Sequence, residues 1–337
     1  MITHLLTIKK LFCSSLAIAL CLSASAMQKD PKGTLLFEKS PFSQCCIQAV
    51  HAKLNVKCAK NVQPQLTYSC CNCARCHFKA QVSGNTLVIK HETTKTCPLA
   101  GCSPCFVNLE LTVPPSCHFK IDANQLQLST NGEPLGDLKM DINQGTLQLN
   151  AECKNCKLDA NNTTFECTKT IQGHLIVDSN TADIKVADVS GDCYFDTNKG
   201  TVKLSNCKNC TFKSNNGSFE CVKKIQGKLI VRGNRTDIKV ADITGNVKVA
   251  GNTAKMDLSY LALPKEAIDI KIRSNTLRST LHLPQNAHVD SDIKTYKNHK
   301  NRVTNEAASA KGPVHFKIKA RANTGSVEIQ STPPSAH

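Results

Sequence analysis

Apolar and polar residues alternate in short runs over most of the chain. Strict alternation of this kind is typical of β-strands that bury one face. The pattern therefore predicts an all-β chain made of many short strands. One set of runs is Leu147-Gln-Leu149, Phe165-Glu-Cys167, Ile184-Lys-Val186, Val202-Lys-Leu204, Phe219-Glu-Cys221, Ile238-Lys-Val240 and Met256-Asp-Leu258, and a second set is Leu175-Ile-Val177, Cys193-Tyr-Phe195, Leu229-Ile-Val231 and Val247-Lys-Val249.

The strands recur at a fixed spacing. Cys153-Lys-Asn-Cys156 returns at an offset of 54 as Cys207-Lys-Asn-Cys210, and within this unit a glycine or asparagine occurs at every 18th position. Both residue types tolerate a left-handed backbone, so we expect a turn of the same shape each time. An apolar residue two positions earlier is expected to point inward. The turn residues are Asn155, Gly173, Gly191, Asn209, Gly227 and Gly245, and the apolar ones Cys153, Ile171, Val189, Cys207, Ile225 and Ile243.

This recurrence favours one all-β architecture over another. Short coils of equal length that stack on one another form a parallel β-solenoid, in which equivalent residues of successive coils are neighbours. A meander of antiparallel hairpins is the competing arrangement, but it does not need a strict period. We therefore predict a parallel, β-helix-like solenoid of about 18-residue coils with a 54-residue (3 × 18) repeat.

The outward residues of the first set of runs carry charges that mostly alternate in sign. In stacked coils such residues lie about 4.8 Å apart, so opposite charges would pair along a ladder. We interpret the carboxylates as members of salt-bridge ladders and not as catalytic groups. The residues in coil order are Glu166, Lys185, Lys203, Glu220, Lys239 and Asp257.

Residues 1–26 have the features of a signal peptide. Lys9 and Lys10 precede an apolar stretch from Leu11 to Leu22, and Ala24-Ser-Ala26 fits the small-residue cleavage site. The apolar stretch is shorter than the roughly 20 residues of a membrane-spanning helix, and no other run is longer. We expect an exported chain, in the periplasm, on the outer surface or secreted, with no transmembrane segment after cleavage and with disulfide bonds among its cysteines.

Composition divides the exported chain into three regions. Residues 27–125 form a cysteine-rich β-strand cap region, residues 126–285 the β-solenoid, and residues 286–337 the basic C-terminal coils and tail. Of the 20 cysteines, 11 lie between Cys45 and Cys117. We expect this cap to cover the open edge of the first coil.

Two cysteine motifs in the cap are candidate cofactor sites. Cys73, Cys76, Cys102 and Cys105 form two C-x2-C pairs with a spacing close to that of zinc ribbons. Cys73-Ala-Arg-Cys76-His77 also fits the C-x-x-C-H pattern of covalent c-type haem attachment. Disulfides compete with both interpretations in an exported chain, so the main expectation is no cofactor, with zinc or haem binding as the alternative.

The solenoid cysteines are expected to be structural. Cys153 and Cys207 occupy inward positions of the repeat, and Cys156 and Cys210 are their candidate local disulfide partners. The two C-x2-C turns lie three coils apart, about 14 Å, so they cannot share one zinc ion. We expect Cys167, Cys193 and Cys221 to be buried apolar groups.

The formal net charge of +16 is concentrated near the C-terminus. An exposed basic segment would attract an anionic polysaccharide or lipid headgroups, and nothing in it indicates specific recognition of nucleic acid. A solvated loop beside a final strand is the alternative. The candidate binding residues are Lys294, Lys297, Lys300, Arg302, Lys317, Lys319 and Arg321.

Several short motifs resemble the bacterial putative-adhesin domain family of unknown function. They are Leu111-Thr-Val-Pro114, Phe119-Lys-Ile-Asp122, Asn198-Lys-Gly-Thr-Val-Lys-Leu204 and Asn323-Thr-Gly-Ser-Val-Glu-Ile329. The resemblance implies an exported β-solenoid with no catalytic residues to transfer. We therefore expect a non-enzymatic, disulfide-stabilised adhesin or cell-envelope protein, with an exported metal, haem or redox protein that uses the N-terminal C-x-x-C motifs as the alternative.

Overall fold

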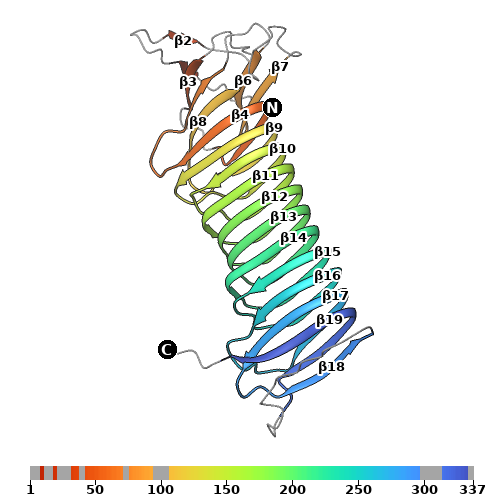
Figure 1. The fold of residues 1–337 in the computed structure, drawn as a ribbon. Helices are drawn as coiled ribbons and strands as arrows, with labels where there is room; N and C mark the ends of the chain where they lie inside the picture. Colours follow the sequence, from red (N-terminus) through yellow and green to blue (C-terminus); the bar gives the residue numbers. More distant parts are fainter. Residues whose placement is uncertain are drawn as a thin grey trace. The chain divides into compact units, whose positions relative to one another are not determined.

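The computed structural model describes residues 8–10, 18–20, 32–37, 42–70, 76–93, 106–296 and 313–332. The regular elements in these ranges are all β-strands, and most of them pair in parallel (Figure 1). The described residues contain no helix long and apolar enough to cross a membrane. The predicted all-β solenoid is thus confirmed. The chain divides into two compact units, residues 1–172 and 173–337.

In the first unit, parallel coils are flanked by antiparallel strands. β4, β9, β10 and β11 pair in parallel in that order. The other edge of β4 pairs with β7 through its first half and with β8 through its second half. Antiparallel pairs β6–β7, β5–β8, β3–β5, β1–β3 and β1–β2 follow. The strands are β1 (Ile8–Lys10), β2 (Ile18–Leu20), β3 (Lys32–Phe37), β4 (Gln44–Cys58), β5 (Gln65–Ser69), β6 (Cys76–Ser83), β7 (Thr86–Thr93), β8 (Val107–Val113), β9 (His118–Gly132), β10 (Leu138–Leu149) and β11 (Cys156–Ile171).

The strands of the second unit pair in parallel throughout. Their order follows the sequence from β12 to β17, but β19 then pairs with β17, and β18 pairs with the outer edge of β19. The last two strands are therefore exchanged relative to chain order. The strands are β12 (Leu175–Val189), β13 (Cys193–Cys207), β14 (Cys210–Ile225), β15 (Leu229–Val240), β16 (Val247–Ser259), β17 (Ile268–Pro284), β18 (Val289–Thr295) and β19 (Phe316–Thr332).

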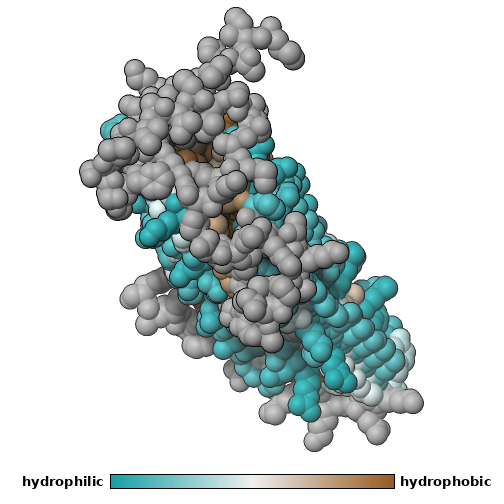
Figure 2. Space-filling view, turned by 90° about the horizontal axis from the view of Figure 1, so that it is seen from above, coloured by the Kyte–Doolittle hydropathy of each residue, from teal (hydrophilic) through white to brown (hydrophobic). Residues whose placement is uncertain are grey.

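The register confirms the period predicted from the sequence. Leu138 pairs with Cys156 and Leu175 with Cys193, at the same offset of 18 that separates the hydrogen-bonded Asn180 and Asn198. The six apolar residues predicted to point inward beside the turns, Cys153 to Ile243, are buried, with exposed fractions of 2 % or less. Alternation therefore arises because every second side chain enters the core of its coil. The outward side chains on the face seen in Figure 2 are mostly hydrophilic.

Each long strand bends at an exposed corner. In β12 the alternation is interrupted by two consecutive exposed residues, Asn180 and Thr181. Equivalent asparagines of the second unit donate side-chain hydrogen bonds to one another from coil to coil, at 2.8–3.2 Å. These ladders satisfy the amide groups where the strands change direction. Their members are Asn180, Asn198, Asn215, Asn234, Asn252, Asn275 and Asn323, and in the first unit Asn124, Asn143 and Asn161.

The recurring glycines are used differently from the prediction. The positive-φ residues of the described chain are Asn61, Ser116, Gly84, Gly132 and Gly325, so the expected left-handed backbone at the recurring turns is wrong. At Gly191 an added Cβ would lie 2.5 Å from the carbonyl oxygen of Gly173. Glycine recurs there because successive turns stack too closely for a side chain.

Candidate functional site

Each strand from β12 to β17, and β19, presents two outward surfaces, one before and one after the asparagine corner; the short β18 extends the first of them. We call them the first face and the second face. On the second face, one pair of the predicted ladder is present: Lys203 lies 3.3 Å from Glu220. Asp257 lies 3.0 Å from His282, which is two positions along β17 from Thr280, the register partner of Asp257. Because these carboxylates have partners along the coils, they are parts of ladders and do not converge on a recess.

The first face carries like charges in the same columns. Lys248, Lys271 and Lys319 are register partners on β16, β17 and β19, and Arg273 is the partner of Arg321. Adjacent strands lie about 4.8 Å apart, so these cations are neighbours. We define the basic face as these residues together with the two remaining basic residues of β18 and β19. Its members are Lys248, Lys271, Arg273, Lys294, Lys317, Lys319 and Arg321.

Three acids lie among these cations. Asp269 is 2.7 Å from Lys271, and Asp290 is the register partner of Lys317. Asp292 forms an ion pair with Arg321, and the hydrogen bond from that guanidinium lowers the pKa of the carboxyl group. The seven cations exceed the three acids, so the basic face keeps a formal charge of +4. Exposed like charges at this spacing repel one another unless an anion or salt screens them.

The structure places part of the predicted anion-binding set on this face. Lys317, Lys319 and Arg321 project from β19, and Lys294 is the register partner of Arg321 on β18. The predicted residues Lys297, Lys300 and Arg302 lie outside the described ranges.

Sequence reasoning missed Lys248, Lys271 and Arg273. β17 pairs with β19 at an offset of 48, for example Lys271 with Lys319, and this is not a multiple of 18. The coil period therefore gave no reason to place β17 beside β19. A search for the Lys-x-Arg spacing common to Lys271-Ile-Arg273 and Lys319-Ala-Arg321 would have aligned the two strands.

The solenoid cysteines are buried, as predicted. Cys153, Cys156, Cys207 and Cys210 are each 1 % exposed, and the structure holds them as free thiols. Burial raises the pKa of Cys156 and of Cys210, which keeps both thiols protonated. Cys193 and Cys210 are register partners, and the thiols of both hydrogen-bond to Cys207. These contacts lower the pKa of Cys207 to about 5. The proposed local disulfides stay a prediction.

The N-terminal cofactor motifs are not tested by the structure. Cys73, Cys102 and Cys105 lie outside the described residues, and of Cys76 only the backbone is described. Both the zinc set and the haem motif Cys73 to His77 therefore stay predictions. Among the residues that are described, no group of three or more His, Cys, Asp or Glu side chains could hold a metal ion.

We expect thiol labelling to separate burial from disulfide formation. In the native chain, Cys153, Cys156, Cys207 and Cys210 should resist a thiol reagent, because a deeply buried thiol is not accessible to it. Cys46, which is partly exposed, serves as the internal reference that labels first. Peptide mass spectrometry after unfolding without reductant then distinguishes free thiols, which label, from disulfides, which do not. Rapid native labelling of Cys153 would contradict the observed burial.

Comparisons with known proteins provide structural likenesses only. No family model matches the chain, and no curated protein matches it. A putative adhesin from Parabacteroides distasonis is 12 % identical with a TM-score of 0.34, over 88 % of this chain and 95 % of the other. One from Bacteroides fragilis is 8 % identical at 0.28, with the same coverage. A putative cell adhesion protein from Clostridium sporogenes is 11 % identical at 0.21, over 89 % and 99 %. Likenesses at these scores carry no argument about what this chain binds.

Proposed function

We propose that this chain is an exported, non-enzymatic β-solenoid of the cell envelope or surface that binds an anionic polysaccharide through the basic face. The observation that carries the proposal is the column Lys248, Lys271 and Lys319, in which three cations follow one another on paired strands. On the second face of the same unit, cations also adjoin, as Lys185 and Lys203 do, but no column of the described strands there holds three in succession, and Lys203 and Lys255 each pair with a carboxylate, Glu220 and Asp237. A polyanion would supply the missing negative charge.

Several features favour a polysaccharide over a lipid surface as the partner of this face. Its outward positions alternate with buried ones, for example exposed Lys271 and Arg273 on either side of buried Ile272. The exposed large hydrophobic residues of the described chain lie elsewhere, except Tyr296 just beyond β18. An array of regularly spaced cations suits a linear polymer with repeating charges, whereas a single tyrosine beside it offers little apolar surface for insertion into a bilayer.

Export and disulfide bonds belong to the proposal as well. Export is supported by the signal-peptide features of residues 1–26, and an oxidising compartment would allow the 18 remaining cysteines to form disulfides. The non-enzymatic role is supported by the pairing of carboxylates on the second face, such as Glu220 with Lys203.

The test is direct binding of the purified chain to heparin as a sulfated polysaccharide probe, with neutral dextran as the control. We expect saturable binding at low salt that weakens by about tenfold or more as ionic strength approaches the physiological value. Binding to dextran with equal affinity would contradict the proposal, and so would the absence of heparin binding at low salt. Binding to anionic vesicles without binding to heparin would also overturn it.

A further inference from the structure

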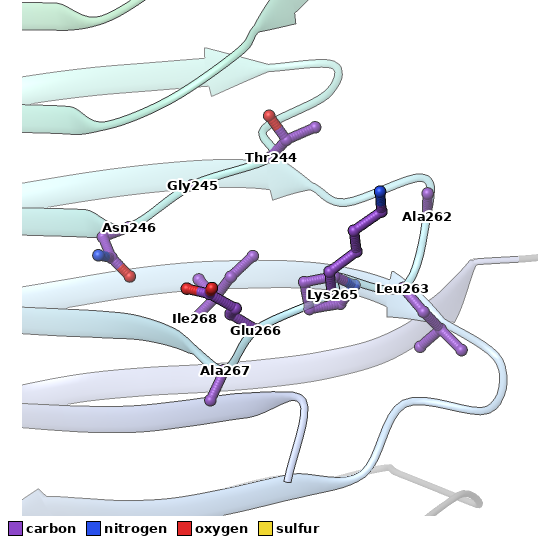
Figure 3. Close-up of a pocket in the computed structure, with 10 residues that line it drawn as sticks. Thr244, Gly245, Asn246, Ala262, Leu263, Lys265, Glu266, Ala267 and Ile268 are labelled. Carbon is purple, nitrogen blue, oxygen red and sulfur yellow. The ribbon is translucent and has the colours of Figure 1, made fainter. Parts of the chain in front are cut away.

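The connection between β16 and β17 is longer than the 18-residue coil requires. Val247 on β16 pairs with Ile270 on β17 at an offset of 23, whereas Leu229 and Val247 are 18 apart. The extra residues fall in the connection from Tyr260 to Ala267, which we call the insertion. It borders a recess of about 440 Å³ together with Thr244 and Asn246 of the preceding coil. In Figure 3, Lys265 lies between Leu263 of the insertion and Ile268, the first residue of β17.

The insertion exposes large apolar side chains. Leu261 is 53 % and Leu263 43 % exposed, and Val222, at the end of the second-face half of β14, is 38 % exposed. Hydrogen bonds link these positions from one coil to the next. The Ala241 N–H donates to the carbonyl oxygen of Cys221, the residue before Val222, at 3.0 Å. The Leu261 N–H donates to Oδ1 of Asp242, the residue after Ala241, at 3.2 Å. Val222 and Leu261 thus follow one edge of the coils, and Leu263 lies two residues beyond Leu261 in the insertion; they are three of the six exposed large hydrophobic residues of the described chain. Scattered exposed leucines need no explanation, but a shared edge indicates an interaction surface.

Lysines flank this apolar edge. Lys223 and Lys265 are exposed, and Lys224 lies 3.2 Å from Asp242. The exposed Glu266 follows Lys265, so these three lysines exceed the two acids by one. Asp242 is only 8 % exposed, and its two oxygens hold Lys224 and the backbone of Leu261, which fixes the base of the insertion. We call the set Val222, Lys223, Lys224, Leu261, Leu263 and Lys265 the apolar–basic edge.

We propose that the apolar–basic edge docks on an anionic lipid bilayer. Leucine and valine side chains gain free energy by entering the boundary between headgroups and acyl chains, and lysines beside them interact with anionic headgroups. A protein partner would also bury the apolar residues, but the lysine border matches a negatively charged surface. The apolar–basic edge lies after the asparagine corner, where the second-face strands end, whereas the basic face lies before that corner. One molecule therefore offers a bilayer and a polysaccharide different surfaces.

The experiment measures binding of the full chain to vesicles of phosphatidylcholine alone or mixed with phosphatidylglycerol. We expect the wild type to bind the mixed vesicles. Leu261→Ser with Leu263→Ser should weaken binding by about tenfold for each leucine at every salt concentration, because it removes the inserted groups. Lys223→Ala with Lys265→Ala should weaken binding only to the anionic vesicles and mainly at low salt. Val62→Ser, which changes a side chain that is 49 % exposed in the first unit, is the matched control and should bind like the wild type.

All substituted positions are exposed, so circular dichroism spectra should match the wild type. The proposal is overturned if the wild type does not bind the mixed vesicles, or if the double leucine variant binds them as tightly as the wild type does. It is also overturned if the leucines support self-association in sedimentation experiments but not vesicle binding. Heparin binding by the double leucine variant should equal that of the wild type, which separates this proposal from the function proposed for the basic face.

Discussion

The Gly233→Ala variant is expected to lower the free energy of unfolding of the second unit by about 2 to 3 kcal/mol. A Cβ at Gly233 would lie 1.8 Å from the backbone carbonyl oxygen of Ser214 on the neighbouring coil and 2.8 Å from Cγ2 of Thr236. The threonine methyl can move, but the carbonyl belongs to the parallel pairing of β14 with β15. Relief therefore requires these two strands to separate at the corner. In a stacked-coil protein each coil depends on its neighbours, so damage at one contact weakens the whole stack.

Urea denaturation followed by circular dichroism measures this effect. Gly200→Ala is the matched control, because its Cβ would meet the backbone carbonyl oxygen of Ala182 at 2.9 Å, a much smaller overlap than the 1.8 Å at Gly233. We expect this control to cost less than half as much as Gly233→Ala, about 1 kcal/mol or less. Adding Thr236→Ala to Gly233→Ala should not restore stability, since the carbonyl contact remains. Equal stability of Gly233→Ala and the wild type would contradict the close stacking of these coils.

The coil period could be predicted because the inward positions encode it. Ile171, Ile225 and Ile243 recur at multiples of the 18-residue interval, and each is buried beside a turn. Burial of one face forces this alternation, so the pattern survives in the sequence whatever the outward residues are. The paired charges of the second face follow from the same geometry, as Lys203 and Glu220 illustrate.

The turn conformation could not be predicted from residue type alone. Residue type predicts positive φ at Gly191 and Gly245, but each lies against the carbonyl oxygen of the preceding turn, at 2.5 Å for an added Cβ. A recurring glycine can allow either a left-handed backbone or the close approach of two backbone segments, and the sequence alone does not distinguish these two uses.

The site could be predicted only in part, because it depends on an interruption of the period. Lys317 to Arg321 stand out in the sequence as a basic segment, but Lys271 and Arg273 join them only through the pairing of β17 with β19. That pairing excludes β18, the strand that follows β17 in sequence, and no local pattern around Val289–Thr295 indicates the exchange. Long-range register is set by packing of the last coils, which a periodic pattern does not encode.

The Lys248→Glu, Lys319→Glu double variant should lose about hundredfold in affinity for heparin and keep or gain stability. The two substitutions change the formal charge of the basic face from +4 to zero and flank Lys271 with opposite charges on β16 and β19. These two new opposite-charge neighbours outweigh the one new like-charge neighbour, Asp292, which is the register partner of position 319 on β18. Electrostatic attraction of a polyanion depends on this net charge. Opposite changes in stability and affinity would exclude misfolding as the cause of lost binding.

The matched control is Lys185→Glu with Arg278→Glu on the second face. It changes the charge of the chain by the same amount, and each new carboxylate is the register partner of a lysine, Lys203 or Lys255. Isothermal titration with heparin should then show near wild-type affinity for the control and a large loss for the basic-face variant. An equal loss of heparin affinity in both variants would mean that binding depends on the net charge of the whole chain and not on the basic face. A basic-face variant that binds like the wild type would place the polyanion elsewhere on the chain.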